Sequence, residues 1–345
     1  MSRTEISILN FIDTEPNCSS AQIAVKFNGS KSLATIKRIL KEVVVNGDVI
    51  KTGAGKNTRY KISNQYKLLN SVNLHQYFEK DIDERKIQTN FNFNLISETL
   101  NDIKLFNKTE IEELDNQHQK FLKKISIFTT KERLNEMERL AIDLSWKSSQ
   151  IEGNTYSLLE TEQLLKEKKT AAGKTKDEAT MLLNHKDAID FIVSQPDYMY
   201  PLSTAKIEDL HSMLVKELGV SKNIRTKRVS ISGTNYLPID NECQIKEAIT
   251  QMCDLVNNKE NIFEIALLTL ILISYIQPFM DGNKRTARIV SNAVLLHFNY
   301  CPLSFRTVDT LDYKKAMVLF YEVNNITAFK KIFIEQYQFA VDTYF

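Results

Sequence analysis

Apolar positions recur at the spacing of α-helices along most of the chain, and strand-like alternation is confined to two short places. Three helices are predicted within residues 1–63, each with apolar residues three or four positions apart. Asn28-Gly29 predicts a turn before the third helix, and Asn46-Gly47 predicts the end of that helix. Two strand-like runs follow, at 48–52 and 58–62. These patterns predict a small helical domain that ends in a two-stranded ribbon.

Helical patterns continue through the rest of the chain. Residues 64–132 are predicted to be a polar helical connector, and 133–345 a second domain of amphipathic helices, interrupted by a hairpin over 228–239. The longest apolar run, 265–276, is shorter than the roughly 18 residues that span a membrane, so we expect a buried helix and no membrane association. The predicted fold class is all-α with one small hairpin, preceded by the domain of residues 1–63.

Charge is unevenly distributed along the chain. The whole chain has 45 Lys and Arg residues against 43 Asp and Glu, which favours neither nucleic acid nor membrane. Residues 1–63 have ten basic residues against five acidic ones, and their order of elements is that of a winged helix-turn-helix. We therefore predict binding to duplex DNA, with a protein-contact domain as the alternative. The cations predicted on the third helix and the ribbon are Lys31, Lys37, Arg38, Lys41, Lys51, Lys56, Arg59 and Lys61.

The four cysteines form no CxxC pair and have no histidine at ligand spacing, so reduced thiols are predicted in place of a zinc site or disulfides. The N-terminal residues lack the apolar core of a signal peptide, which predicts a cytoplasmic protein. The sequence leaves open whether the protein forms a homo-oligomer.

Candidate chemistry is concentrated in the run YIQPFMDGNKRTAR, residues 275–288. Gly282 stands in a loop that leads into a helix, where unpaired backbone N–H groups and the helix dipole attract anions. Arg285 and Arg288 are three positions apart on that helix, so their guanidinium groups can hold successive phosphates. Asp281 offers a carboxylate for Mg²⁺. Asn283 can orient a phosphate oxygen or hold the loop closed.

This run resembles the signature of the Fic family, HPFx(D/E)GN(G/K)RxxR, at every position except the first. In that family the histidine is the general base that takes the proton from a target hydroxyl, which attacks the α-phosphate of ATP, so that AMP is transferred and pyrophosphate is released. The resemblance implies ATP and Mg²⁺ as cofactors and a protein hydroxyl, including one on the chain itself, as the target. It places Gln277 at the general base, Asp281 on Mg²⁺, Gly282 and Asn283 in the anion hole, Arg285 on phosphate and Arg288 on the γ-phosphate.

Two further segments are similar to parts of the same family. Ser148-Ser149-Gln150-Ile151-Glu152-Gly153-Asn154 resembles the inhibitory motif (S/T)xxxE(G/N), which contains Ser148 and Glu152 and lies N-terminal to the core. The resemblance implies that Glu152 pairs with Arg288 and keeps the γ-phosphate away. Residues 225–238 resemble the flap hairpin that aligns a target segment as an added strand, with Tyr236 near the adenine.

Two positions depart from the common pattern. Lys284 replaces a glycine and is also found in the phosphate-transferring Doc branch, but the retained Gly282 and Arg288 favour AMP transfer. Gln277 replaces the histidine, and an amide cannot take a proton near neutral pH, which predicts impaired chemistry. None of the five histidines stands beside the signature as a substitute, and His185 and His211 are interpreted as structural.

The sequence thus predicts a winged helix-turn-helix over 1–63, a connector over 64–132 and a Fic domain with its inhibitory helix over 133–345. The predicted function is protein AMP transfer, inhibited by Glu152 and impaired at Gln277. The alternative is a nucleotide-sensing pseudoenzyme that acts as a DNA-binding regulator.

Overall fold

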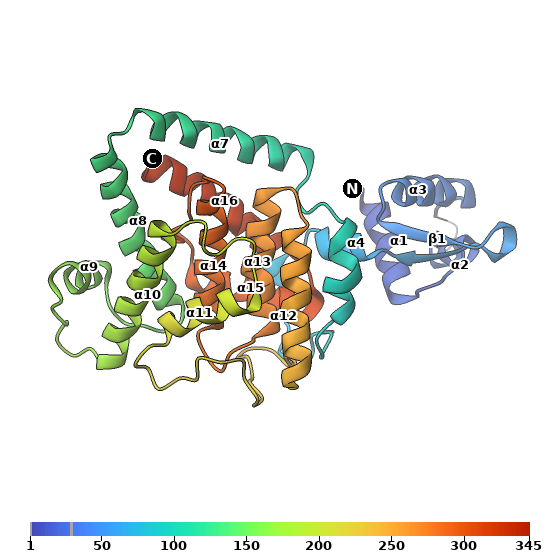
Figure 1. Cartoon of the computed structure of the whole chain (residues 1–345). Coiled ribbons are helices and arrows are strands. Elements are labelled where there is room, and N and C mark those ends of the chain that lie inside the picture. The colour runs from blue at the N-terminus through green and yellow to red at the C-terminus, as the bar shows by residue number, and fades with distance from the viewer. Residues whose placement is uncertain (1, 28–29) are drawn as a thin grey trace. The chain divides into compact units, whose positions relative to one another are not determined.

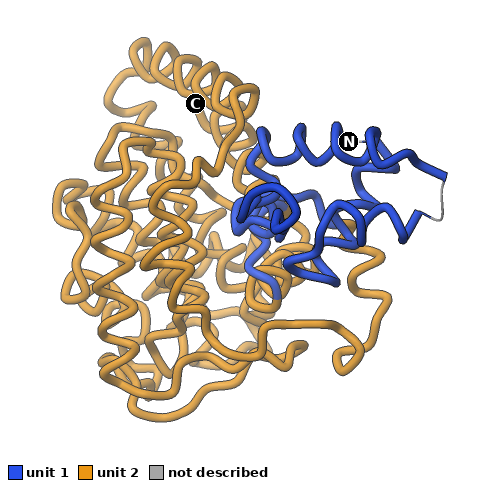
Figure 2. The backbone as a smooth tube through the Cα atoms, turned by 90° about the vertical axis from the view of Figure 1, so that its right-hand side faces the viewer, with its two compact units in different colours: residues 1–72, 323–327 blue, residues 73–322, 328–345 orange. Residues whose placement is uncertain are grey.

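The computed structural model describes residues 2–27 and 30–345, so the predicted turn at Asn28-Gly29 lies outside the described residues (Figure 1). The chain divides into two compact units (Figure 2). Unit 1 contains Met1–Val72 and Val323–Thr327, and unit 2 contains Asn73–Glu322 and Ala328–Phe345. The chain therefore enters unit 1 twice. The division after residue 72 differs from the predicted one after 63, and a single helix runs through the predicted boundary at 132.

Unit 1 has the predicted order of three helices and a ribbon, followed by a short fourth helix. The serines before α1 and α2 make reciprocal capping boxes, which satisfy backbone donors of each first turn. Apolar residues from all three long helices and both strands form one core. The elements are α1 (Arg3–Thr14), α2 (Ser20–Lys26), α3 (Leu33–Val45), β1 (Val49–Thr52), η1 (Gly55–Asn57), β2 (Arg59–Ile62) and α4 (Asn64–Leu69).

The strands β1 and β2 are antiparallel, with Val49 opposite Ile62 and Ile50 opposite Lys61. Val49 and Ile62 are buried, while Lys61 is exposed, so the ribbon has one core face and one solvated face. The second segment of unit 1 is fixed by backbone bonding, because Ile326 N donates to Leu68 O at 2.9 Å.

Unit 2 is built around α13, whose residues are buried on every side. Helices α12 and α14 pack against it (Figure 1). Within the described ranges, no helix is long and apolar enough to cross a membrane. The helices are α5 (Leu74–Phe78), η2 (Leu95–Thr99), α6 (Leu100–Asp102), α7 (Lys108–Ile127), α8 (Thr130–Ile151), α9 (Leu158–Glu167), α10 (Lys176–Ser194), α11 (Thr204–Leu214), α12 (Glu242–Asn257), α13 (Ile262–Ile276), α14 (Asn283–His297), α15 (Thr310–Val323) and α16 (Thr327–Thr343).

The predicted hairpin over 228–239 is wrong, because this segment contains no pair of hydrogen-bonded strands. Its backbone bonds to the connector instead: Leu237 N donates to Thr89 O at 2.7 Å, and Arg85 Nη2 donates to Gly233 O at 2.8 Å. Residues 79–94 of the connector, predicted as helical, are accordingly mostly extended or irregular. An extended segment can satisfy its backbone with a distant partner, which short-range sequence patterns do not reveal.

A mutation that creates a cavity in the core of unit 1 would test how much that core stabilises the unit. Leu40 on α3 is buried, so Leu40→Ala should destabilise unit 1 by about 2–5 kcal/mol. Hydrogen exchange of the amides in residues 8–62 measures this loss. Val45 lies on the same helix and is 77% exposed, so Val45→Ala should leave exchange nearly unchanged. Equal exchange in both variants would contradict the prediction.

Candidate functional site

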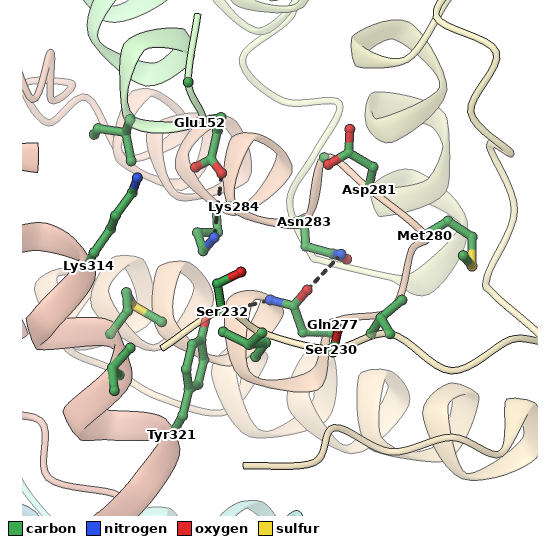
Figure 3. Close-up of a pocket in the computed structure, with 17 residues that line it drawn as sticks. Glu152, Ser230, Ser232, Gln277, Met280, Asp281, Asn283, Lys284, Lys314 and Tyr321 are labelled. Atoms are coloured by element: carbon green, nitrogen blue, oxygen red, sulfur yellow. Dashed lines mark hydrogen bonds and ion pairs between the residues drawn. The ribbon is translucent and has the colours of Figure 1, made fainter. Parts of the chain in front are cut away.

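A cavity of about 350 Å³ opens beside the N-terminus of α14 (Figure 3). Four parts of unit 2 line it: the end of α8, the extended segment before α12, the loop between α13 and α14, and one face of α15. Those lining residues are Ile151, Glu152 and Gly153; Val229, Ser230, Ile231 and Ser232; Gln277, Met280, Asp281, Gly282, Asn283 and Lys284; and Lys314, Met317, Val318 and Tyr321.

Gln277 ends α13 in the left-handed conformation, with φ of 54°, and its side chain is fully engaged. The amide nitrogen Nε2 donates to Ser274 O at 2.7 Å and lies 3.5 Å from Tyr321 Oη. The amide oxygen Oε1 accepts from Asn283 Nδ2 at 2.9 Å. The residue at the predicted general-base position therefore lines the cavity and fixes the loop that follows it.

The loop between α13 and α14 is fixed by hydrogen bonds within the loop and by one from the extended segment. Asn283 Oδ1 accepts from Phe279 N, and its Nδ2 donates to Phe279 O, both at 2.8 Å. Of the two roles predicted for Asn283, the structure contains the loop-closing one. Arg225, a buried residue that the sequence reasoning did not single out, donates from Nε to Gln277 O at 2.6 Å and from Nη1 to Lys227 O at 2.9 Å. It ties the extended segment to this loop.

Gly282 precedes α14 with φ of 79°, and no side chain caps the helix. The left-handed backbone there favours glycine, and a Cβ atom would also lie 3.2 Å from His211 Cε1, a close contact that would require His211 to shift. The N–H groups of the first turn of α14 have no partner within the helix, and such a helix N-terminus, here next to the cavity, attracts anions. His211 contacts this turn, with Nδ1 3.1 Å from Thr286 Oγ1. Burial lowers the pKa of His211 to about 4, so its imidazole is neutral near pH 7.

Asp281 and Arg285 form an ion pair at the rim, with Arg285 Nη2 3.0 Å from Asp281 Oδ2. The Asp281 side chain is 64% exposed and lines the cavity, so its second oxygen is available to a cation. Arg285 is buried and does not line the cavity; among the described residues its Nε and Nη1 have no hydrogen-bond partner. The buried guanidinium places positive charge beside this end of the cavity, and the exposed carboxylate fits Mg²⁺ bound together with phosphate oxygens.

Glu152 lies at the end of α8 and contacts two cations of α14. Its Oε1 is 2.9 Å from Arg288 Nη2, which is the predicted ion pair. Its Oε2 is 3.4 Å from Lys284 Nζ (Figure 3). Burial raises the pKa of Glu152, but Arg288 and Lys284 outweigh this effect, and the net pKa lies below the ordinary value. The carboxylate is therefore held ionised at the cavity wall.

Arg288 and Ser148 are buried behind the cavity and do not line it. Arg288 Nε donates to Ser148 Oγ at 2.7 Å, and Nη2 donates to Ser148 O at 2.9 Å. His185 Nε2 lies 2.6 Å from the same hydroxyl, so one of the two histidines interpreted as structural belongs to this network.

Tyr236, predicted to lie near the adenine, does not line the cavity. Its buried ring stacks on Tyr275 and Tyr321, with centroids 5.2 and 5.6 Å apart. The sequence reasoning missed the α15 residues that do line it, which offer an apolar strip and the cation Lys314. Residues 314, 317, 318 and 321 share one helical face by spacing, but spacing alone did not show what that face contacts.

Comparisons with known proteins place this site in context. Residues 201–295 match the model of the Fic/DOC family. The protein adenylyltransferase Fic of Nematostella vectensis is 26% identical over 175 residues, 49% of this chain and 40% of the relative. That of Aedes aegypti is 24% identical over 187 residues, 52% of this chain and 37% of the relative. The matches thus span about two fifths of the length of these curated relatives.

Solved structures share the fold at low identity. Fic-1 from C. elegans has a TM-score of 0.59 and 18% identity, over 68% of this chain and 72% of that one. A Fic family protein from Desulfovibrio desulfuricans G20 has a TM-score of 0.58 and 17% identity, over 69% and 74%. The structural likeness shows the mostly helical fold. Together the comparisons show a match to the Fic/DOC family over residues 201–295 and a shared helical fold, and the matching curated relatives are named protein adenylyltransferase Fic.

The Glu152 ion pairs should make stability depend on pH. A carboxyl group with a lowered pKa stabilises the fold above its unfolded value, ordinarily 4.5, and this contribution is lost as the pH falls through the folded value. Glu152→Gln should lower the free energy of unfolding at pH 7 by about 1.5–3 kcal/mol, the range for a hydrogen bond to a charged group. Urea unfolding at pH 7 and at pH values below 4.5 should show the difference from wild type shrinking in acid.

Glu162→Gln is a matched control, because Glu162 forms an exposed ion pair with Lys166 at 2.7 Å on α9. It should change the stability little at either pH. If Glu152→Gln and Glu162→Gln behave alike, the Glu152 carboxylate does not stabilise the fold.

Proposed function

We propose that this protein transfers AMP from ATP to a protein hydroxyl, that Glu152 inhibits the reaction, and that Gln277 leaves it slow. The observation that carries the proposal is the contact of Glu152 with Arg288 at 2.9 Å, beside a cavity that combines an uncapped helix N-terminus, a carboxylate and several cations. The protein adenylyltransferases among its relatives support this reaction at the level of the family.

The triphosphate of ATP would lie along the first turn of α14. The N–H groups of the first turn after Gly282 fit the inner phosphates, the buried Arg285 adds positive charge beside them, and Arg288 fits the γ-phosphate once Glu152 has moved away. Met317 and Val318 of α15 offer an apolar surface for the base. Asp281 would hold Mg²⁺, which neutralises phosphate charge during the transfer.

Glu152 competes with that binding mode. A carboxylate at Arg288 occupies the donor that the γ-phosphate needs, and it adds negative charge next to a triphosphate. Lys284 strengthens the hold on Glu152 with a second contact at 3.4 Å. Two cations that would otherwise face the phosphates are thereby neutralised. Nucleotide would bind weakly, or with its γ-phosphate displaced, until Glu152 moves away.

Gln277 accounts for slow chemistry. A general base needs a lone pair that takes a proton near neutral pH, and the amide has none. Its oxygen already accepts from Asn283 and its nitrogen donates to Ser274 O, so it serves to order the loop. The two buried histidines, His185 and His211, do not line the cavity and so do not replace the missing base.

A second function, binding of duplex DNA by unit 1, is favoured by the exposed cations of that unit. Lys37, Arg38 and Lys41 of α3 are exposed, as is Lys61 of β2. Arg38 also pairs with Glu42 at 2.6 Å, an exposed contact that DNA phosphates can readily replace. We infer that unit 1 is a winged helix-turn-helix that places α3 in the major groove and the ribbon along the backbone. A protein with both units would then connect nucleotide chemistry to a DNA site.

Gln277→His should raise AMP transfer about 10²–10⁴-fold, the usual contribution of a general base. The change is best made together with Glu152→Gly, which removes the proposed inhibition. Incubation with ATP and Mg²⁺, followed by intact-mass measurement, shows AMP added to the chain itself, and labelled ATP shows transfer to lysate proteins.

The control combines Glu152→Gly with the native Gln277 and should stay nearly inactive. Absence of added AMP on the chain and on lysate proteins, with both changes present and the fold intact, would contradict AMP transfer.

Replacement of Lys37, Arg38 and Lys41 by alanine should weaken DNA binding and flatten its salt dependence. The slope of log K against log salt is negative, and each phosphate contact that is lost makes it less steep by about 0.9. Fluorescence anisotropy with duplex DNA at several salt concentrations measures both quantities. Lys108 and Lys331 of unit 2 are also exposed, and their replacement by alanine should leave binding unchanged. If neither the native chain nor these control variants bind duplex DNA at low salt, the DNA-binding proposal is contradicted and unit 1 is a protein-contact domain.

A further inference from the structure

The guanidinium of Arg288 has two sets of contacts with α8 that differ in character. Glu152 reaches it from the cavity side, with a side chain that is 21% exposed. Ser148, one helical turn earlier, reaches it from within the core through both its hydroxyl and its backbone carbonyl. Arg288 and Ser148 are completely buried. Displacement of Glu152 from Arg288 therefore leaves the two Ser148 contacts in place.

The orientation of the Ser148 hydroxyl follows from its neighbours. Arg288 Nε can only donate, so Ser148 Oγ accepts from it. The hydroxyl hydrogen is then free for His185 Nε2 at 2.6 Å, which accepts when the imidazole is neutral. Burial, together with the nearby Arg288 and Arg285, holds the pKa of His185 well below its ordinary value. A hydrogen-bond chain thus runs from His185 on α10 through Ser148 to Arg288.

We propose that His185 and Ser148 are positioning residues that hold Arg288 toward the γ-phosphate of ATP, independently of Glu152. The inference rests on the proposed function and separates two residues of one sequence motif. Glu152 occupies the arginine, whereas Ser148 holds its guanidinium in position. The ring of Tyr313 also packs against the guanidinium, with its centroid 5.4 Å from Arg288 Cζ.

The test compares affinities for ATP and ADP in the full chain carrying Glu152→Gly, by titration calorimetry. Ser148→Ala should weaken ATP binding about tenfold and leave ADP binding unchanged, because only ATP has the phosphate that Arg288 holds. Ser148→Thr keeps the hydroxyl and should restore ATP affinity. Ser145→Ala is the matched control, since Ser145 is buried on the same helix and donates to Ala141 O at 2.8 Å.

His185 provides a second pair of variants. His185→Leu removes the acceptor and should reproduce the loss seen with Ser148→Ala, whereas His185→Gln offers an amide oxygen as an acceptor and should restore most of the affinity. Thermal unfolding checks the fold of each variant. With Glu152 intact, Ser148→Ala should not increase ATP affinity, in contrast to Glu152→Gly.

Three outcomes overturn the inference: ATP affinity unchanged by Ser148→Ala, equal weakening of ATP and ADP, or an increase in ATP affinity. ATP binding by the Glu152→Gly parent, with no effect of Ser148→Ala, rejects the positioning role alone. Failure of that parent to bind ATP or ADP rejects the proposed function, and the positioning role with it.

Discussion

The buried guanidinium of Arg288 is the constraint around which unit 2 is arranged at its functional site. A charge removed from water must be paired and hydrogen-bonded, and several helices supply partners for Arg288 Nε and Nη2, while Nη1 has no hydrogen-bond partner among the described residues. Ser148 and Glu152 approach from α8, and the ring of Tyr313 approaches from α15. α10 contributes indirectly, since His185 fixes the Ser148 hydroxyl. Segments far apart in the sequence are thus brought to one side chain of α14.

The need to pair the buried Arg288 also explains how the proposed inhibitory contact can be formed without destabilising the fold. A carboxylate stabilises the buried arginine in the absence of a nucleotide, so the contact of Glu152 with Arg288 can support folding in addition to the proposed inhibition. A γ-phosphate is an equivalent anion and can replace it without leaving the arginine unpaired. The proposed switch is therefore an exchange of anions at a preformed cation, and Ser148 keeps that cation in place during the exchange.

Gln277 illustrates how a position can lose one property and keep another. The side chain lacks the basic nitrogen of the expected histidine, but its amide bonds to Ser274 O and to Asn283, so it connects the last turn of α13 to the start of α14. Gly282 then precedes α14, whose first turn has free N–H groups beside the cavity. A residue that cannot act as a base is thus compatible with an ordered loop beside the cavity, and the proposed nucleotide binding depends on that loop.

Local sequence patterns determined the helices and the ribbon of unit 1, because helical periodicity and strand alternation depend on residues only a few positions apart. The signature run likewise identified Gly282, Asp281 and the two arginines, since a loop leading into a helix fixes their relation within a few residues. Tertiary structure decided the rest. Residues 228–239 bond to the connector and not to each other as strands, Tyr236 is buried in an aromatic stack, and α15 supplies a cavity wall. Each depends on which distant segment lies opposite, and that is set by packing of the whole unit.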